Sequence, residues 1–207
     1  VRDLVRTAFE RPDEKRTNPG AATLLREMAR AGVSIHILSG SPEQMRRRLE
    51  DKLRLDGITW DSFTLKPNLQ NVLRLRFRAV KDQLGYKLPA LLLARTALGE
   101  VSAKETLFGD DAEADAFVYS LYEDVLAEAL RCVRLVKPAD VVERILIHLE
   151  QQTPPSDFQV YGSRVVPFYN YLQAAFVVHE DGRLEAEGVL RVAAEMVTQH
   201  RFDGDAL

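Results

Sequence analysis

This sequence lacks the features that mark disulfide-rich, membrane-spanning or nucleic-acid-binding proteins. Its 207 residues include one cysteine, Cys132, so no disulfide can form within the chain. A single thiol fits a reducing compartment such as the cytoplasm. No apolar run approaches the roughly 20 residues that a membrane-spanning helix needs. The formal net charge is −3, so no bulk positive field attracts nucleic acid. Hydrophobic residues form 46% of the chain, which is enough to bury a full core.

The most informative stretch, residues 106–119, joins an apolar run to an acidic cluster. Thr106-Leu107-Phe108 leads to Gly109, and four acidic side chains follow within six residues: Asp110, Asp111, Glu113 and Asp115. Apolar residues then recur at spacings of three and four, so the pattern predicts a buried strand, a tight turn and an amphipathic helix. Carboxylates at the carboxyl end of a strand can hold a hard cation such as Mg²⁺. The alternative is that Asp110 and Asp111 only stabilise the turn and cap the helix.

A second strand, turn and helix is predicted at residues 33–55. Alternating apolar residues at 33–38 end in Ser39-Gly40-Ser41-Pro42, and a helix is expected over 43–55. Proline suits a first helical position. The backbone N–H groups of Gly40, Ser41 and Glu43 could then face an anion, which the helix dipole favours. The alternative is that Ser41 simply caps the helix.

Basic residues lie between these two stretches. The apolar spacing predicts a helix over 71–84, with Arg74, Arg78 and Lys81 on another face of it. Gly85 is expected to break this helix, and residues 86–89 are expected to open another. Lys87 would then sit at a helix start, where the dipole disfavours a cation. An anionic group nearby would explain it, and the alternative is an ordinary exposed lysine.

The remaining pattern predicts a doubly wound, Rossmann-like α/β fold with a mainly parallel sheet flanked by helices. Further strands are expected at 58–65 and 132–136, and a helix from 139 to about 151. The Pro-rich stretch 152–157 reads as a linker. We therefore expect an α/β core at 1–151 and a C-terminal helical hairpin within 158–207, with helices near 166–178 and 185–200. This hairpin would pack on the main body or on the second subunit of a homodimer.

Three of these pieces, in this order, resemble the haloacid dehalogenase superfamily of phosphohydrolases. Ser39 matches its second motif, a hydroxyl residue ending a strand. Lys87 matches the third motif, with Lys81 and Lys104 as rivals. Gly109-Asp110 with Asp115 matches the fourth, of the form Gly-Asp-x-x-x-x-Asp. The Ser-x-Ser-Pro turn, the lysine spacing and Tyr119 look most like the actin-patch-type phosphatidate phosphatase catalytic domain and its bacterial relatives. The resemblance covers roughly residues 17–125.

The resemblance implies a Mg²⁺-dependent phosphatase that acts through an aspartyl-phosphate. Asp110 would bind the metal directly and Asp115 through water. Ser39, Gly40 and Ser41 would hold phosphate oxygens, and Lys87 would offset the charge of the phosphate and the nucleophile. The short segment between Ser39 and Lys87 leaves no room for a large cap. An open site of that kind suits a bulky phosphorylated substrate, such as a lipid head group or a phosphoprotein.

The family's first motif, Asp-x-Asp-x-Thr after an apolar strand, does not occur in this sequence. Asp203-Gly204-Asp205 has the right letters, but it follows an expected helix. We therefore expect that the nucleophile lies upstream of Val1 and that these 207 residues alone are inactive. The alternative function is a non-catalytic module of the same fold that binds phosphate or Mg²⁺. A receiver domain of the response-regulator kind fits less well, because its lysine should come last.

Overall fold

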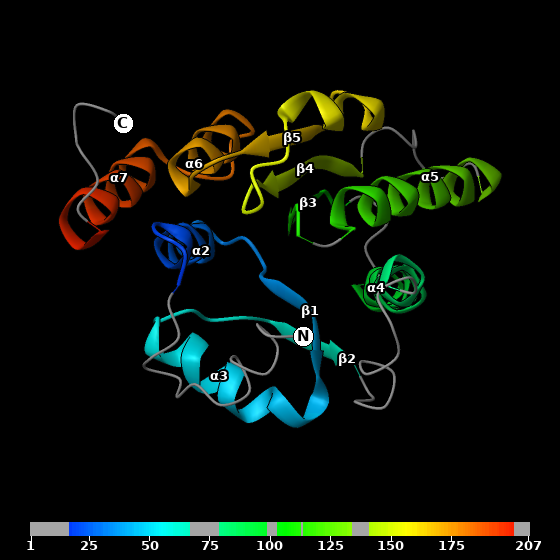
Figure 1. Cartoon of the computed structure of the whole chain (residues 1–207), viewed down its shortest axis with the longest axis horizontal. Coiled ribbons are helices and arrows are strands. Elements are labelled where there is room, and N and C mark those ends of the chain that lie inside the picture. Colours follow the sequence, from blue (N-terminus) through cyan, green and yellow to red (C-terminus); the bar gives the residue numbers. More distant parts are fainter. Residues whose placement is uncertain (1–16, 67–78, 99–102, 113, 134–140, 201–207) are drawn as a thin grey trace. The chain divides into compact units, whose positions relative to one another are not determined.

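The computed structural model describes residues 17–66, 79–98, 103–112, 114–133 and 141–200. The chain divides into two compact units. One comprises residues 1–69 and 170–207, and the other comprises residues 70–169. Figure 1 labels the elements of both units.

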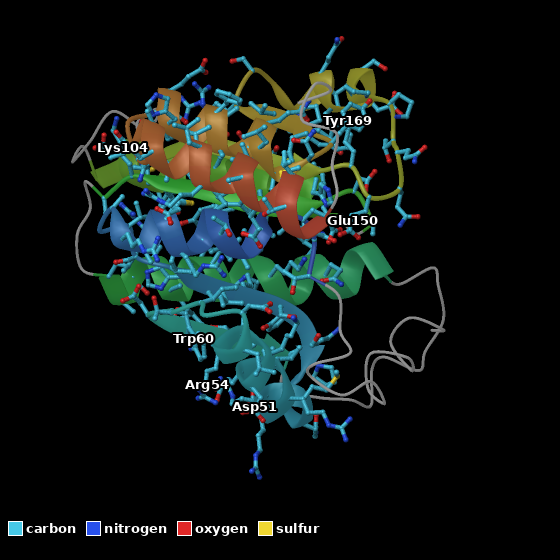
Figure 2. The ribbon with its side chains drawn as sticks, turned by 90° about the vertical axis from the view of Figure 1, so that its left-hand side faces the viewer. Asp51, Arg54, Trp60, Lys104, Glu150 and Tyr169 are labelled. Atoms are coloured by element: carbon cyan, nitrogen blue, oxygen red, sulfur yellow. The ribbon has the colours of Figure 1, made fainter. Side chains whose placement is uncertain are left out.

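In its described residues, the first unit contains a two-stranded parallel sheet and four α-helices. Its elements are α2 (Ala21–Arg30), β1 (His36–Pro42), the 3₁₀ helix η1 (Glu43–Met45), α3 (Arg46–Leu55), β2 (Ser62–Lys66), α6 (Tyr171–Glu180) and α7 (Ala186–His200). Strand β1 pairs with β2 from His36 opposite Ser62 to Ser39 opposite Leu65. The register then shifts between Ser39 and Pro42. Beside this sheet, Arg54 of α3 lies over Trp60, 5.6 Å from the ring centroid, and pairs with Asp51 (Figure 2).

The C-terminal helices α6 and α7 pack against α2. Gly20, at the start of α2, has a φ of +80°, and a Cβ there would lie 3.0 Å from the sulfur of Met196. Glu27 of α2 is buried and forms ion pairs with Arg191 of α7 and with Arg30. Burial opposes ionisation of Glu27, but the two arginines outweigh it and lower its pKa. The predicted helical hairpin is therefore present, and it belongs to the same unit as α2. Its first helix begins at Tyr171, and the predicted start near 166 is wrong because Val165–Phe168 forms a strand.

The second unit contains a three-stranded parallel sheet covered by helices. Its elements are α4 (Ala79–Leu98), β3 (Glu105–Asp110), α5 (Asp115–Val133), β4 (Val142–His148), the 3₁₀ helix η5 (Pro155–Tyr161) and β5 (Val165–Phe168). The strand order is β3-β4-β5, and both pairings are parallel. Val118, Tyr122 and Ile145 are among the buried side chains where α5 meets the sheet. The predicted linker at 152–157 lies within this unit, and the chain passes to the first unit at about residue 170.

The helix predicted from 139 to 151 is wrong, because Val142–His148 forms the central strand β4. Apolar residues at 141, 142, 145, 146 and 149 fit a helical period, so periodicity favoured a helix. In the fold, Ile145, Leu146 and Ile147 are all fully buried. A central parallel strand is covered on both faces, so its apolar residues need not alternate. The strand predicted at 132–136 is also not found as such, since Cys132 and Val133 end α5 and residues 134–136 lie outside the described residues.

The helix break predicted at Gly85 is wrong as well, because α4 runs without interruption through Gly85 and Pro89. A proline inside a helix costs about 3 kcal/mol, since it removes a backbone hydrogen bond and its ring crowds the carbonyl four residues earlier. That carbonyl belongs to Gly85. Leu84, Leu88 and Leu91 of α4 pack against the buried core of the unit, which compensates for the proline. The predicted basic face at Arg74 and Arg78 lies outside the described residues.

The helices and parallel sheets confirm the predicted α/β class. Strands β1 and β3 belong to different hydrogen-bonded sheets, so a single doubly wound sheet stays a prediction. None of the helices in the described parts of the chain is long and apolar enough to cross a membrane.

Candidate functional site

A buried ion pair lies at the carboxyl end of β3 and joins two of the predicted site residues. Asp115 is the first residue of α5, and its Oδ1 atom pairs with the ammonium of Lys87 from α4. Its Oδ2 atom accepts a hydrogen bond of 3.3 Å from the backbone N–H of Asp110. Lys87 is only 3% exposed and Asp115 only 4%. The two charges are thus held against each other, away from bulk water, directly beside the last residue of β3.

The position of Lys87 follows from the apolar face of α4. Leu84, Leu88 and Leu91 pack on the core, and Lys87 falls on the same face at helical spacing. Because that face is buried, the ammonium needs a buried anion, and Asp115 supplies it. The sequence predicted that Lys87 lies at a helix start. This is wrong, because Lys87 lies in the interior of α4. A lysine within an apolar stripe was the stronger signal in the sequence.

The rival lysines have different surroundings. Lys104 has a side chain that is 54% exposed and pairs with Glu143 at 3.1 Å. The side chain of Lys81 lies outside the described residues. Among the three candidates, Lys87 is thus the one seen in contact with a residue of the acidic motif. The contact is with Asp115, the last residue of the Gly-Asp-x-x-x-x-Asp motif.

Gly109 allows β3 and α5 to approach closely at this point. A Cβ built on Gly109 would lie 2.5 Å from the Cβ of Asp115 and 2.9 Å from Cε2 of Tyr119. Such distances are far inside van der Waals contact, so a side chain at 109 would push α5 away. The hydroxyl of Tyr119 donates to the backbone oxygen of Phe108 at 3.1 Å and ties the same two elements together. Gly109 is therefore needed for the buried position of Asp115.

The acidic residues of the turn have separate roles. Asp110 Oδ1 accepts a hydrogen bond from the N–H of Ala112 and thereby stabilises the turn. Asp111 faces the segment that follows β4, where its two oxygens accept from the N–H groups of Gln151 at 2.7 Å and Thr153 at 3.0 Å. Its own N–H donates to the backbone oxygen of His148. The turn-stabilising alternative therefore holds for Asp110, whose side chain bonds within the turn, whereas the side chain of Asp111 anchors the segment after β4.

We expect Asp111→Asn to lower stability near neutral pH by about 1–2 kcal/mol, because hydrogen bonds to a charged acceptor are stronger than neutral ones. Burial opposes ionisation of Asp111, but the N–H groups of Gln151 and Thr153 outweigh it and lower its pKa. A lowered folded-state pKa gives stability that is present above the unfolded pKa of about 3.9 and is lost as pH falls through the folded value. Urea unfolding at several pH values should therefore show the two proteins converging in acid. A difference that does not change with pH would contradict this role.

Ser39, Gly40 and Ser41 belong to the last part of β1, in the first unit. The N–H of Ser41 donates to Ser39 Oγ at 3.2 Å. Pro42 is still extended, and the three-residue η1 separates it from α3. The helix predicted over 43–55 is therefore present as η1 followed by α3. The open turn predicted before it is wrong, because β1 runs to Pro42 and the Ser41 N–H has a partner within the segment. A strand that keeps extended geometry to Pro42 explains the difference.

The described residues do not complete a Mg²⁺ site. Both oxygens of Asp115 have partners, Lys87 and the Asp110 N–H. Within the described parts of the chain, no group of three or more His, Cys, Asp or Glu side chains is arranged to hold a metal. Mg²⁺ prefers octahedral oxygen ligands, usually including one or two carboxylates. Asp110 stays a candidate ligand, while Asp115 acts here as the partner of Lys87.

A second buried polar cluster, which the sequence analysis missed, lies at the opposite end of β3. Arg95 near the end of α4 pairs with Glu105 at 2.9 Å and also donates to the backbone oxygen of Ala103. Tyr122 of α5 donates to the other oxygen of Glu105 at 2.8 Å. Burial raises the pKa of Tyr122, and the charge of Glu105 adds to this effect. This cluster joins α4, β3 and α5, so it supports the orientation of α4 that presents Lys87 to Asp115.

The contacts of Lys87, Gly109, Asp110 and Asp115 define the candidate site of the second unit, which we call the β3 site. Its likeness to the haloacid dehalogenase superfamily rests on these residues together with Ser39. No protein-family model, curated protein or solved structure matches this chain.

Proposed function

We propose that this chain is the core of a phosphohydrolase of the haloacid dehalogenase type. One observation carries the proposal: the buried pair of Lys87 and Asp115 beside Asp110, at the carboxyl end of the parallel strand β3. Ligands of parallel α/β sheets bind at that end of the strands. A buried ion pair is seldom worth its desolvation as a stabilising device alone, so its place at a strand end favours a functional role.

In this proposal Asp115 keeps Lys87 protonated and fixes where its ammonium lies. A lysine held in this way is a positive point charge beside the place where a phosphoryl group would lie. Ser39 and the N–H of Gly40 would hold phosphate oxygens. This requires β1 and β3 to be strands of one doubly wound sheet, with Ser39 and Asp110 at the same end. The described residues do not complete a Mg²⁺ site, so no step is assigned to the metal.

The substrate class is proposed from the sequence resemblance. It is a phosphomonoester, and a bulky one such as a lipid head group or a phosphoprotein suits a site without a large cap. The alternative is a binding module that holds phosphate without turnover. The absence of the Asp-x-Asp motif from the sequence favours that alternative. The buried Lys87–Asp115 pair favours the enzyme, because binding alone does not require a buried, fixed charge.

The test is hydrolysis of 4-nitrophenyl phosphate, with and without Mg²⁺. We expect negligible turnover by these 207 residues, because the matched motifs contain no aspartate nucleophile. We expect turnover by a form of the protein that carries an Asp-x-Asp motif upstream of Val1. In that protein Asp110→Asn should remove most of the activity, and Ser39→Ala should lower kcat by about 100- to 1000-fold, as expected for the loss of one oxyanion donor. Lys104→Met, which changes an exposed pair outside the β3 site, serves as the control.

The outcomes separate the two functions. Full activity of the 207-residue chain would refute the argument about the missing nucleophile. A form with the upstream motif that is inactive on a range of phosphoesters, but whose phosphate binding is lost in Ser39→Ala, would favour the binding module. A protein that neither binds nor hydrolyses phosphate would refute both.

A further inference from the structure

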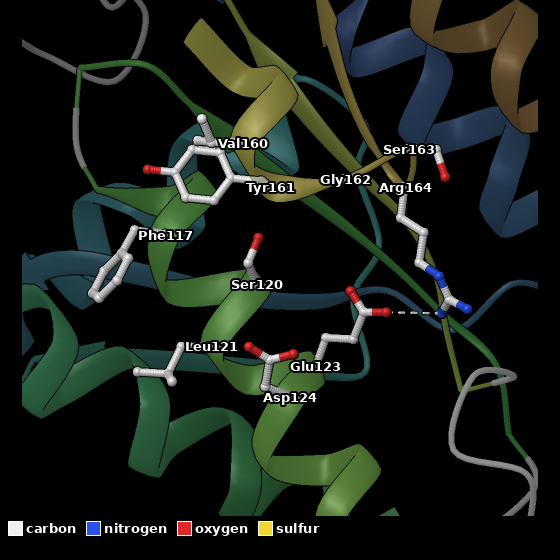
Figure 3. Close-up of a pocket in the computed structure, with 10 residues that line it drawn as sticks. All are labelled: Phe117, Ser120, Leu121, Glu123, Asp124, Val160, Tyr161, Gly162, Ser163 and Arg164. Carbon is white, nitrogen blue, oxygen red and sulfur yellow. Dashed lines mark ion pairs between the residues drawn. The ribbon is translucent and has the colours of Figure 1, made fainter.

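A cavity of about 560 Å³ lies in the second unit between α5, η5 and the residues that follow η5 (Figure 3). Phe117, Ser120, Leu121 and Asp124 line it from α5 at spacings of three and four, so they form one helical face. The face of α5 that carries Asp115, Tyr119 and Tyr122 points into the core instead. The cavity is therefore separate from the β3 site, and its volume is within the range of small-molecule sites.

Two polar groups of the cavity lack partners among the described residues. The hydroxyl oxygen of Ser120 is buried and has no hydrogen-bond partner there. In Figure 3 it points from α5 toward the side on which Tyr161 lies. A buried polar atom without a partner costs about 1–3 kcal/mol, so such atoms need an explanation. Asp124 also lines the cavity, is exposed to solvent, and forms no ion pair within the described parts of the chain.

The charges of the cavity are unbalanced. Glu123 pairs with Arg164 at 3.0 Å, and the same guanidinium donates to the backbone oxygen of Val142. The guanidinium of Arg164 thus already has two partners, Glu123 and the Val142 backbone oxygen. Asp124 adds a second carboxylate to the cavity lining. Burial raises the pKa of Glu123, Arg164 opposes the rise and Asp124 increases it. The lining therefore favours a cation and disfavours an anion.

Apolar side chains line the cavity as well. Phe117 is 40% exposed on α5, and Val160 is 81% exposed on η5. Both line the cavity, together with the ring of Tyr161. Exposed apolar side chains that gather around a few polar groups are typical of a ligand site.

We propose that this cavity binds a small organic ammonium ion with an aromatic or aliphatic body. The ammonium lies against Asp124 and donates to the Ser120 hydroxyl oxygen, while the body lies between Phe117 and Val160. Arg164 pairs with Glu123 and holds it in place. The ligand therefore does not meet two adjacent carboxylates that both lack an ion-pair partner. This site does not depend on the proposed phosphatase activity.

The probe is 2-phenylethylamine, which is protonated at pH 7, titrated into the ¹⁵N-labelled chain. We expect shifts of the backbone amide signals of Phe117, Ser120, Asp124 and Val160, with a Kd on the order of 1 mM for so small a ligand. 3-Phenylpropanoate, which has the opposite charge on a similar body, should not bind at the same concentrations. Butylamine should bind more weakly, because it lacks the ring.

Matched variants test the assignment. Asp124→Asn should weaken binding of 2-phenylethylamine about two- to fivefold, the range of one exposed ion pair. Ser120→Ala should also weaken binding of the amine. Glu128 is an exposed acid one turn further along α5, and Glu128→Gln should leave binding unchanged. Equal binding of the amine and the carboxylate would overturn the proposal. Shifts that map elsewhere, or an unchanged Kd in Asp124→Asn, would also overturn it.

Discussion

Lys87→Met is expected to lower the free energy of unfolding by about 3–5 kcal/mol, the cost of leaving one partner of a buried pair uncompensated. Asp115 would keep its buried carboxylate and the N–H of Asp110, but it would lose the ammonium on its other oxygen. Methionine has a similar length and suits the apolar face of α4, so lost packing contributes little. Urea or guanidinium unfolding followed by circular dichroism measures the effect.

Two controls separate the charge from the length of the side chain. Lys104→Met removes an exposed pair with Glu143 and should cost less than about 1 kcal/mol. The double variant Lys87→Met with Asp115→Asn removes both charges and should recover a large part of the loss. Equal effects of Lys87→Met and Lys104→Met would show that the Lys87–Asp115 pair is not a buried, charged pair in solution.

Gly109→Ala is expected to destabilise the protein by about 3 kcal/mol, at the upper end of the range for overpacking. The new methyl group would lie 2.5 Å from Asp115 Cβ and 2.7 Å from Asp115 Oδ2. Asp115 starts α5 and is held by Lys87, so it can move only if the helix or the ion pair moves with it. The same variant should therefore also abolish the proposed phosphatase activity.

Gly85→Ala is the matched control, and we expect the opposite sign. Gly85 lies in an exposed part of α4, and a Cβ there would have no atom within 4 Å. Alanine in a helix interior is more stable than glycine by about 0.5–1 kcal/mol. Thermal unfolding of the two variants should move the midpoint down for Gly109→Ala and up for Gly85→Ala. Two equal shifts would contradict the close approach of β3 to α5.

Local patterns were most reliable where one face of an element is buried. The apolar run into Gly109, the acidic turn and the spacing after Asp115 predicted β3 and α5, and α5 does begin at Asp115. The helices α6 and α7 were also predicted. By contrast, β4 was predicted as a helix because its apolar residues fit a helical spacing, although in the fold it is a central strand with Ile145, Leu146 and Ile147 all buried. The continuous α4 was missed because Gly85 and Pro89 are local helix breakers, whereas its packing is a long-range effect.

The sequence by itself determined the α/β class, the strand, turn and helix around Gly109, and which residues were candidates for the β3 site. Those features depend on local period, turn residues and spacing. Only the tertiary structure decided that Lys87 pairs with Asp115, that Asp111 anchors the segment after β4, and that α5 and η5 enclose a cavity. The reason is physical: a buried charge takes whichever opposite charge the packing brings within reach, and packing joins residues far apart in the chain.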